Sequence, residues 1–391
     1  MSRPRRQLSL LGEPIAAPRI DRGVITTREV DTMIAAAAPV AIGVSGGKDS
    51  CALAFATIEH LDAVGHRGPR ILIHSDLGRV EWKDSAPTCQ RLADRLGLEL
   101  VTVRREAGDM MDRWLVRWAN NVERYEALSC VRLILPWSTA SMRFCTSELK
   151  TAIICRELVR RWPGRTILSA CGIRREESAK RRQAPIAKAQ PKLTSAPRRT
   201  TGIDWHPILD WTIGDVLAFL AARGFPLHEA YTRFGSSRVS CAFCVLASQG
   251  DIAASASCPD NADIYREMVD LEIVSSFSLQ SNAWLGDVAP QLLSEEQRAG
   301  MADAKQRAAR REAIEARIPK HLLYTKGWPT CVPTRDEAEL LADVRRAVAD
   351  LMRFTSMRCL DADGVIARYA ELLEAKAARG GDVDDEETEA A

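Results

Sequence analysis

The segment at residues 43–50, GVSGGKDS, gathers glycines, hydroxyl groups and one lysine. Glycine allows the backbone to approach a phosphate closely, and the free amide groups at a helix start favour an anion. Ser45, Lys48 and Ser50 add side-chain donors. These residue types predict a phosphate-binding loop, and the alternative is a glycine-rich turn without a ligand.

A Walker A loop does not fit this segment. That loop needs a first glycine, four residues of any type, and then Gly-Lys followed by Ser or Thr. Here Ile42 stands at the first-glycine position, and Asp49 follows the lysine. The segment is therefore a candidate phosphate loop of another kind.

A second candidate is GIRREESAKR at residues 172–181, which carries Arg174 and Arg181 behind Gly172. Arginines clustered just past a strand end suit bidentate recognition of phosphate. The alternative is the solvated start of a helix.

Four cysteines have a spacing that suggests a metal. Cys241 and Cys244 form a CxxC pair, Cys258 follows it, and Cys145 lies upstream. Four thiolates satisfy either a tetrahedral zinc ion or a [4Fe–4S] cluster. The spacing alone does not choose between them, and an unmetallated segment is the third alternative.

Other chemically interesting residues have ordinary explanations. Cys51, Cys155 and Cys171 stand in apolar contexts that predict core positions. Trp114 and Trp118 have helical spacing, which favours core packing over the stacking of bases.

Short apolar runs that alternate with helical patterns must position these residues. Strands are expected at 39–44, 70–76, 98–105 and 165–172, with helices after residue 50, over 83–96, around 146–162 and from about 213. This alternation predicts an α/β fold with a doubly wound parallel sheet. Residues 179–202 contain seven basic residues, no acid and three prolines, and they predict a loop that is either a flap over a polyanion or a solvated connector.

We divide the chain into an N-terminal arm (1–35), a nucleotide-binding α/β domain (36–234), a cysteine-rich segment (235–275), a helical region (276–378) and an acidic tail (379–391). The 391 residues are 46% hydrophobic and 27% charged, which excludes collagen-like, long coiled-coil and wholly disordered proteins. The net charge is +2, but the last ten residues carry six acids and no base, so the remainder is at +8.

No stretch has the length and apolar character of a signal peptide or a membrane span, so we expect a cytoplasmic protein with no membrane partner. Thiols stay reduced in that compartment, and the eleven cysteines are therefore not expected to form a disulfide framework.

Taken in order along the chain, the motifs resemble those of a known superfamily. SGGKDS resembles the PP-loop of the ATP pyrophosphatase superfamily. HSDLGRVEW (74–82), RFCTSELK (143–150) and GIRREESAKR resemble motifs of its phosphoadenosine phosphosulfate reductase-like branch. The resemblance covers about residues 36–260 and implies the adenine nucleotide alpha-hydrolase-like fold.

Within the superfamily, the chain resembles most closely the ATP pyrophosphatase/sulfurtransferase of DNA phosphorothioation (Dnd/Ssp type). This resemblance implies ATP and Mg²⁺ as cofactors, with catalytic roles for Lys48, Asp49, Arg174 and Arg181. It implies ATP binding by a larger set: Ser45, Gly46, Gly47, Lys48, Asp49, Ser50, Asp76 and Gly172. It favours a [4Fe–4S] cluster on Cys145, Cys241, Cys244 and Cys258, with zinc as the alternative.

The implied partners are a cysteine desulfurase as sulfur donor, DNA as acceptor, and other subunits of a modification system. The alternatives are a phosphoadenosine or adenosine phosphosulfate reductase, a tRNA thiolase, and a nucleotide-binding subunit without turnover. Many such reductases use a thiol on a C-terminal tail. The acidic tail of this chain has none, and Cys359 stands in a helical context instead.

Overall fold

The computed structural model describes residues 23–281 and 283–379, and these form two compact units. The first unit comprises the chain up to Ser75, Lys83–Val103 and Ile154–Arg233. The second comprises Asp76–Trp82, Arg104–Ile153 and the chain from Phe234 onward. The two units are therefore interleaved along the sequence.

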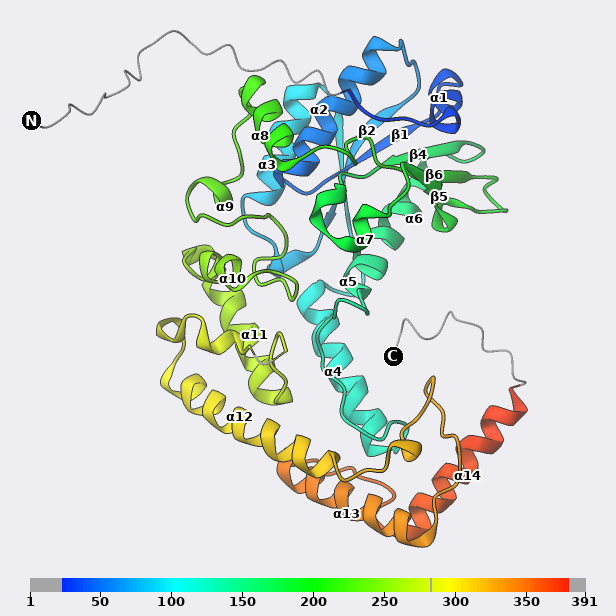
Figure 1. Ribbon diagram of the computed structural model, residues 1–391, viewed down its shortest axis with the longest axis vertical. Coiled ribbons are helices and arrows are strands. Elements are labelled where there is room, and N and C mark those ends of the chain that lie inside the picture. Colours follow the sequence, from blue (N-terminus) through cyan, green and yellow to red (C-terminus); the bar gives the residue numbers. More distant parts are fainter. Residues whose placement is uncertain (1–22, 282, 380–391) are drawn as a thin grey trace, which may run out of the picture. The chain divides into compact units, whose positions relative to one another are not determined.

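The first unit is built on one six-stranded sheet with the order β3-β2-β1-β4-β6-β5 (Figure 1). Its strands are β1 (Val40–Val44), β2 (Arg70–Asp76), β3 (Glu99–Arg104), β4 (Thr166–Ala170), β5 (Ala187–Ala189) and β6 (Thr201–Trp205). The β1–β2, β1–β4 and β4–β6 pairs are parallel, whereas β5 is antiparallel to β6. The expected α/β fold is confirmed, with one short antiparallel strand added at an edge.

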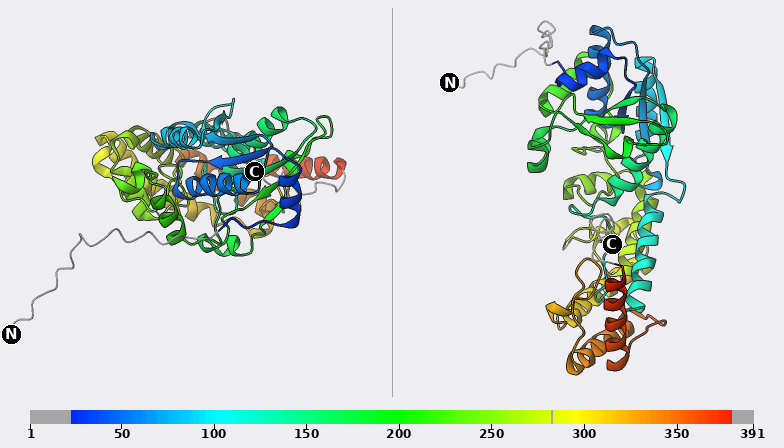
Figure 2. Two further views of the ribbon diagram at one scale, coloured as in Figure 1. Left: turned by 90° about the horizontal axis from the view of Figure 1, so that it is seen from above. Right: turned by 90° about the vertical axis from the view of Figure 1, so that its right-hand side faces the viewer.

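Both faces of the sheet are covered by helices (Figure 2). Ile42 of β1 packs into the core beneath α1 (Arg28–Ala35), α2 (Lys48–Ala63), α3 (Ser85–Leu96) and α8 (Ile213–Ala222). Its neighbour Ala41 packs into a separate core with α6 (Ala152–Arg161). Because successive strand residues point to opposite faces, strands covered on both sides read as continuous apolar runs.

Two sequence predictions for this unit need correction. The expected loop at 179–202 contains α7 (Ala179–Arg182), the strand β5 and the 3₁₀ turn η4 (Pro191–Leu193). The strand forms because Ala187–Ala189 pairs with β6, a partner that local composition does not reveal. The predicted arm includes helix α1, whose N-cap Thr27 accepts a hydrogen bond from the Val30 amide. Residues 1–22 of the arm lie outside the described residues, as does the acidic tail from residue 380.

The second unit is mainly helical. Its helices are α4 (Met110–Glu126), α5 (Phe144–Thr146), α10 (Gln249–Ala256), α11 (Ala262–Ser275), α12 (Glu295–Glu315), α13 (Arg335–Met352) and α14 (Ala362–Ala378). A π-helical turn, η2 (Ser147–Thr151), joins α5 to α6. Leu341 of α13 and Tyr369 of α14 are buried in one core with Leu128, which follows α4. None of the described helices combines the length and the apolar character needed to cross a bilayer.

Candidate phosphate site and cysteine segment

The turn between β1 and α2 holds the candidate phosphate loop. Helix α2 begins at Lys48, and its N-cap Gly47 makes no side-chain capping bond. The Ser50 hydroxyl accepts a hydrogen bond from the Ser45 amide (3.2 Å) and donates to the Gly47 carbonyl (2.8 Å). Ser50 therefore braces the loop from within, beside any role in binding phosphate.

Gly46 is required by the geometry of this turn. Its φ is +75°, a left-handed conformation that side-chain-bearing residues rarely adopt. A Cβ atom at this position would also lie 2.9 Å from the Ser85 carbonyl oxygen. The turn thus depends on glycine for both its conformation and its space.

Charged groups of the two predicted motifs meet at the loop. The Lys48 ammonium lies 3.5 Å from the Asp49 carboxylate, and Arg174 Nε donates to Asp49 Oδ1 at 2.6 Å. Arg174 also pairs with Glu176, and only 5% of its side chain is exposed. Burial works against the charged guanidinium, but Asp49 and the neighbouring glutamates hold the pKa of Arg174 above its usual value. Arg174 is thus a permanent, partly buried cation at the loop.

The chain after β4 packs directly on the start of α2. A Cβ atom at Gly172 would lie 3.1 Å from the Asp49 carbonyl oxygen, so glycine permits this close approach. The Arg174 amide donates to Glu177 at 2.6 Å, and Arg181 forms an ion pair with the same carboxylate. The structure therefore brings Gly172, Arg174 and Arg181 into one network with the phosphate loop.

This network lies where the sheet changes direction. The chain runs from β1 outward through β2 to β3, and then places β4 on the other side of β1. Ligands of open α/β sheets bind outside the carboxyl ends of the strands at such a switch point. The phosphate loop follows β1 and the Arg174 segment follows β4, so both occupy the expected position.

Two residues of this site have no signal in the sequence. The Lys48 amide donates to the Tyr231 hydroxyl (3.2 Å), and the Lys48 ammonium lies 4.9 Å from the centre of the Tyr231 ring. Buried His228 lies 3.3 Å from the Ser85 hydroxyl through Nε2. Tyr231 lies far from the loop in sequence and in no recognised motif, so only the fold reveals it.

Asp76, which the resemblance includes among the ATP-binding residues, belongs to the second unit. Its carboxylate accepts a hydrogen bond from the Gly78 amide (2.7 Å) and from Arg104 Nε (2.9 Å). Its contact with a nucleotide stays a prediction.

The CxxC pair of the second unit is held by backbone contacts. Cys241 forms an isolated antiparallel bridge with Glu81, and the Ala242 amide donates to the Val80 carbonyl at 2.7 Å. The Leu246 amide donates a hydrogen bond to the Cys244 sulfur (3.5 Å).

Three of the predicted ligands share one electrostatic environment. Burial raises the pKa of the Cys241 thiol, Cys244 and Cys145 raise it further, and Lys150 opposes them. Unmetallated, Cys241 would therefore stay protonated, whereas a coordinated metal ion deprotonates a thiol outright. Cys145 and Cys244 therefore lie near enough to affect the Cys241 thiol, and their ligation of one metal centre stays a prediction.

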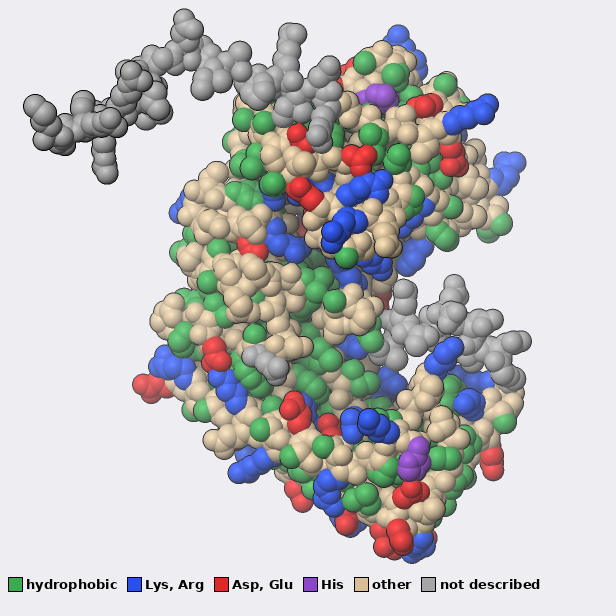
Figure 3. All heavy atoms as spheres, viewed as in Figure 1, with side chains coloured by type: hydrophobic (Ala, Val, Ile, Leu, Met, Phe, Trp, Pro, Cys, Tyr) green, Lys and Arg blue, Asp and Glu red, His purple; other side chains and the backbone are tan. Residues whose placement is uncertain are grey.

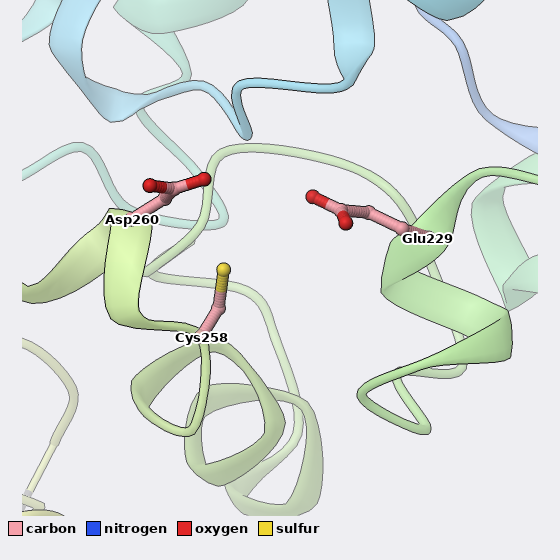
Figure 4. A group of neighbouring side chains, drawn as sticks. All are labelled: Glu229, Cys258 and Asp260. Carbon is pink, nitrogen blue, oxygen red and sulfur yellow. The ribbon is translucent and has the colours of Figure 1, made fainter.

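Cys258 has a different setting. It is buried immediately before the 3₁₀ turn η5 (Pro259–Asn261), and its sulfur lies within 4.8 Å of an Asp260 carboxylate oxygen (Figure 4). Figure 4 also labels Glu229, which belongs to the first unit and is not one of the predicted ligands.

The sulfur positions bear on the choice of metal. Over the described residues, no three of the four cysteine sulfurs lie within 4.8 Å of one another. A tetrahedral zinc ion with bonds of about 2.3 Å needs sulfurs roughly 3.8 Å apart, which this arrangement does not supply. A four-iron cluster places an iron on each thiolate and spaces the sulfurs more widely, so its assignment to these four cysteines stays a prediction.

The sheet order and the position of the loop at its switch point are consistent with the adenine nucleotide alpha-hydrolase-like fold. The family model of the phosphoadenosine phosphosulfate reductase domain matches residues 39–247, more than half of the chain. The chain therefore belongs to the phosphoadenosine phosphosulfate reductase domain family. No curated protein sequence matches it.

Two solved structures are similar to parts of the chain. The phosphoadenylyl-sulfate reductase from Candida auris, in a phosphate complex, is 12% identical, with coverage of 56% of this chain and 98% of that one and a TM-score of 0.33. The U34-tRNA thiolase NcsA from Methanococcus maripaludis, with its [4Fe-4S] cluster, is 14% identical, with coverage of 72% and 75% and a TM-score of 0.35. Similarities of this size bear on neither the substrate nor the cofactor of this chain.

Proposed function

We propose that the protein is an ATP pyrophosphatase that activates a DNA backbone phosphate for sulfur incorporation. One observation carries the proposal: a glycine-dependent loop at the switch point of the sheet is flanked by Lys48 and by the buried cation Arg174. A site of this kind fits the phosphates of a nucleotide.

The proposed reaction has two steps. An oxygen of the acceptor phosphate attacks the α-phosphorus of ATP, the bond to the bridging α,β oxygen breaks, and pyrophosphate leaves with that oxygen. A sulfur nucleophile then attacks the adenylated phosphorus of the acceptor, a P–S bond forms, and AMP leaves. No net oxidation occurs at phosphorus, so sulfur that attacks as sulfide gives the phosphorothioate directly. Sulfur that attacks as a persulfide gives P–S–S–R, and a thiol must then break the S–S bond and leave as a disulfide with the donor sulfur.

The residues of the loop divide these tasks. The Gly46 and Gly47 backbone and the Ser45 hydroxyl would bind the departing pyrophosphate. Lys48 and Arg174 would neutralise the charge that develops on it in the transition state, and Arg181 would support Arg174 through Glu177. The Arg174–Asp49 pair keeps the guanidinium oriented toward the loop until the nucleotide competes for it.

The Asp49 carboxylate is the group at this loop that fits Mg²⁺, a cation that prefers oxygen ligands and keeps part of its water shell. When bound, the ion would screen the negative charges of the triphosphate. Asp49 would then exchange its contacts with Lys48 and Arg174 for the ion, which would free both cations for phosphate.

The cysteine segment is the candidate sulfur-handling region. Cys145, Cys241, Cys244 and Cys258 would hold a [4Fe–4S] cluster that takes part in sulfur relay or braces the site, and a cysteine desulfurase would deliver the sulfur. Besides burial, the thiols of Cys244 and Cys145 raise the pKa of Cys241, and this proximity supports a shared metal centre.

A polyanionic acceptor is supported by the basic segment that follows Arg174. Its exposed basic side chains are Lys180, Arg182, Lys188, Lys192, Arg198 and Arg199. Basic residues displayed together favour a nucleic-acid backbone through the release of counterions.

The proposal is tested by measuring pyrophosphate release from ATP with and without duplex DNA. We expect DNA-stimulated release that Lys48→Ala abolishes and that the exposed-lysine control Lys376→Ala leaves unchanged. The family match favours one second candidate, reduction of a phosphosulfate. Sulfite formation from phosphoadenosine phosphosulfate with a thiol reductant, without pyrophosphate release from ATP, would establish that candidate instead.

A further inference from the structure

One face of helix α4 in the second unit borders a small cavity of 110 Å³. Six residues line it: Arg113, Arg117, Asn120, Asn121, Arg124 and Ile134. We propose that this cavity, the α4 arginine pocket, binds one phosphate group of a nucleic-acid backbone.

The spacing along the helix brings the arginines together. Arg113 and Arg117 are four residues apart, and Arg124 follows after seven more, so the three side chains share one helical face. The amides of Asn120 and Asn121 lie on the same side, and Asn121 is held by a hydrogen bond to the Ile134 carbonyl. The pocket thus combines guanidinium and amide donors.

The positive charge of the pocket is only partly balanced. Arg113 forms a bidentate pair with Glu148 at 2.7 and 3.0 Å. Over residues 23–281 and 283–379, neither Arg117 nor Arg124 has a carboxylate within ion-pair distance. Three guanidinium groups therefore face one carboxylate, which leaves the pocket about two charges positive.

Arg117 is held in place as a donor. Its side chain is almost fully buried, it donates to the Leu135 carbonyl and the Met142 sulfur (both 3.2 Å), and it stacks 5.0 Å from the Phe144 ring. Burial lowers the pKa of Arg117, and the charges of Arg113 and Arg124 lower it further. Like charges kept together in a concave site cost free energy, and a bound anion would offset that cost.

The size and lining of the pocket select the ligand. The cavity has room for one tetrahedral oxyanion, and Ile134 is its single apolar lining residue. Arginine binds phosphate oxygens in a bidentate manner, and asparagine amides commonly donate to nucleic-acid phosphates. A nucleic-acid phosphate is favoured over free phosphate because the proposed function already requires a DNA acceptor; this choice rests on that function.

Other basic residues of the second unit are balanced differently. On α12, Arg307 pairs with Asp303, and in Figure 3 acidic and basic side chains alternate over the surface of α12 and α13. Arg310 of α12 is exposed on that mixed surface and provides a control of the same residue type.

The test is the salt dependence of DNA binding by the full-length protein. Fluorescence anisotropy with a labelled duplex would compare wild type, Arg124→Gln, Asn120→Ala and the control Arg310→Gln. Loss of one phosphate contact should weaken binding about eightfold at 0.1 M salt and reduce the slope of log K against log salt by about 0.9. We expect this change for Arg124→Gln, a smaller loss for Asn120→Ala, and wild-type behaviour for Arg310→Gln.

Two results would overturn the proposal. In the first, Arg124→Gln and Arg310→Gln bind DNA with the same affinity and salt slope. In the second, Arg124→Gln binds DNA like the wild type but is no longer stabilised against thermal unfolding by inorganic phosphate. That result would make the pocket a site for free phosphate. Pyrophosphate release from ATP without DNA should be unchanged in Arg124→Gln. If the wild-type protein releases no pyrophosphate under any condition, but Arg124→Gln still reduces the salt slope of DNA binding, the proposal for the pocket holds and the proposed function fails.

Discussion

Arg174 is the residue on which the proposed chemistry of the loop depends most. It is nearly buried, its pKa stays above the usual value, and it contacts Asp49, which adjoins the phosphate loop lysine. We expect Arg174→Gln to lower pyrophosphate release by about 10²-fold, the order seen when one donor to a developing charge is lost. Steady-state kinetics would measure the effect. Arg160→Gln, at an exposed arginine of α6, should change the rate by less than twofold. Equal rates for the two variants would remove Arg174 from the mechanism.

A second prediction at the level of single residues concerns iron binding by the cysteines. Cys241 and Cys244 form the CxxC pair of the proposed cluster, so replacing either with Ser should abolish iron binding in protein purified without oxygen. Iron content and the visible absorption spectrum would measure this. Cys258→Ser tests the fourth ligand. Cys155→Ser, at a buried cysteine that is not a predicted ligand, is the control and should bind as much iron as the wild type. Full iron content in all four variants would contradict a cysteine-ligated cluster.

At the level of single residues, the sequence motifs predicted the charged residues of the candidate phosphate site. They did not predict a residue that only the fold brings into contact with the loop. Lys48, Asp49, Gly172, Arg174 and Arg181 were predicted from motifs, and the structure joins them in one network. Tyr231 was not predicted, because its contact with the Lys48 amide joins residues that are 183 positions apart in the sequence, and no local pattern encodes such a contact.

At the level of elements, the β1–α2 turn depends on the conformation of one glycine. Gly46→Ala would place a methyl group 2.9 Å from the Ser85 carbonyl at a positive φ, so we expect it to displace the loop and weaken ATP binding at least tenfold. Gly65, after α2, is the matched control, because its φ is +70° but no atom lies within 4 Å of an added Cβ. Gly65→Ala should cost about 1 kcal/mol of stability and leave ATP binding unchanged. Calorimetric titration with ATP would show the difference, and similar losses in both variants would indicate a general effect of strain.

The start of helix α4 gives a prediction about pH. Burial opposes ionisation of its N-cap Asp109, but bonds from Arg79 and from the Asp112 amide lower the pKa of Asp109 to about 2. A carboxylate whose pKa falls on folding adds stability above its unfolded value near 3.8, and that stability is lost as the pH falls toward 2. The shift corresponds to about 2 kcal/mol.

Urea unfolding between pH 5 and pH 2 would measure this contribution. Asp109→Asn keeps a good helix cap but removes the charge, so the variant should lack this part of the acid-dependent loss. Asp263→Asn, at a fully exposed side chain, should follow the wild-type curve. A wild-type slope in Asp109→Asn would show that the ion pair does not stabilise the folded state.

Helices and strands were predictable to the extent that their patterns are local. The strands β1, β2 and β4 are mainly apolar because helices cover both faces of the sheet, whereas the edge strand β3 contains no buried residue. Each of the four was predicted within two residues of its observed ends. The strand β5 was missed because three residues between prolines become a strand only through pairing with β6. The sequence predicts one helical region over 276–378, whereas the structure divides it into the separate helices α12, α13 and α14.

At the level of the whole molecule, the linear sequence hides how the chain is divided. The second unit draws on Asp76–Trp82, Arg104–Ile153 and the chain from Phe234, so its core joins segments that lie far apart in the sequence. Buried Arg345 of α13 shows this: its guanidinium donates to the carbonyls of Tyr125, Glu126 and Arg358. Such contacts cannot be deduced from composition, because they depend on which distant carbonyls the fold leaves without partners.

The central claim is that the β1–α2 turn binds the triphosphate of ATP. Calorimetric titration of the intact protein with ATP and with AMP, in the presence of Mg²⁺, tests it most directly. We predict that ATP binds at least 10²-fold more tightly than AMP, and that Lys48→Ala removes this difference while Lys376→Ala preserves it. Equal affinities for ATP and AMP in the wild-type protein, or an ATP preference that survives Lys48→Ala, would contradict the account.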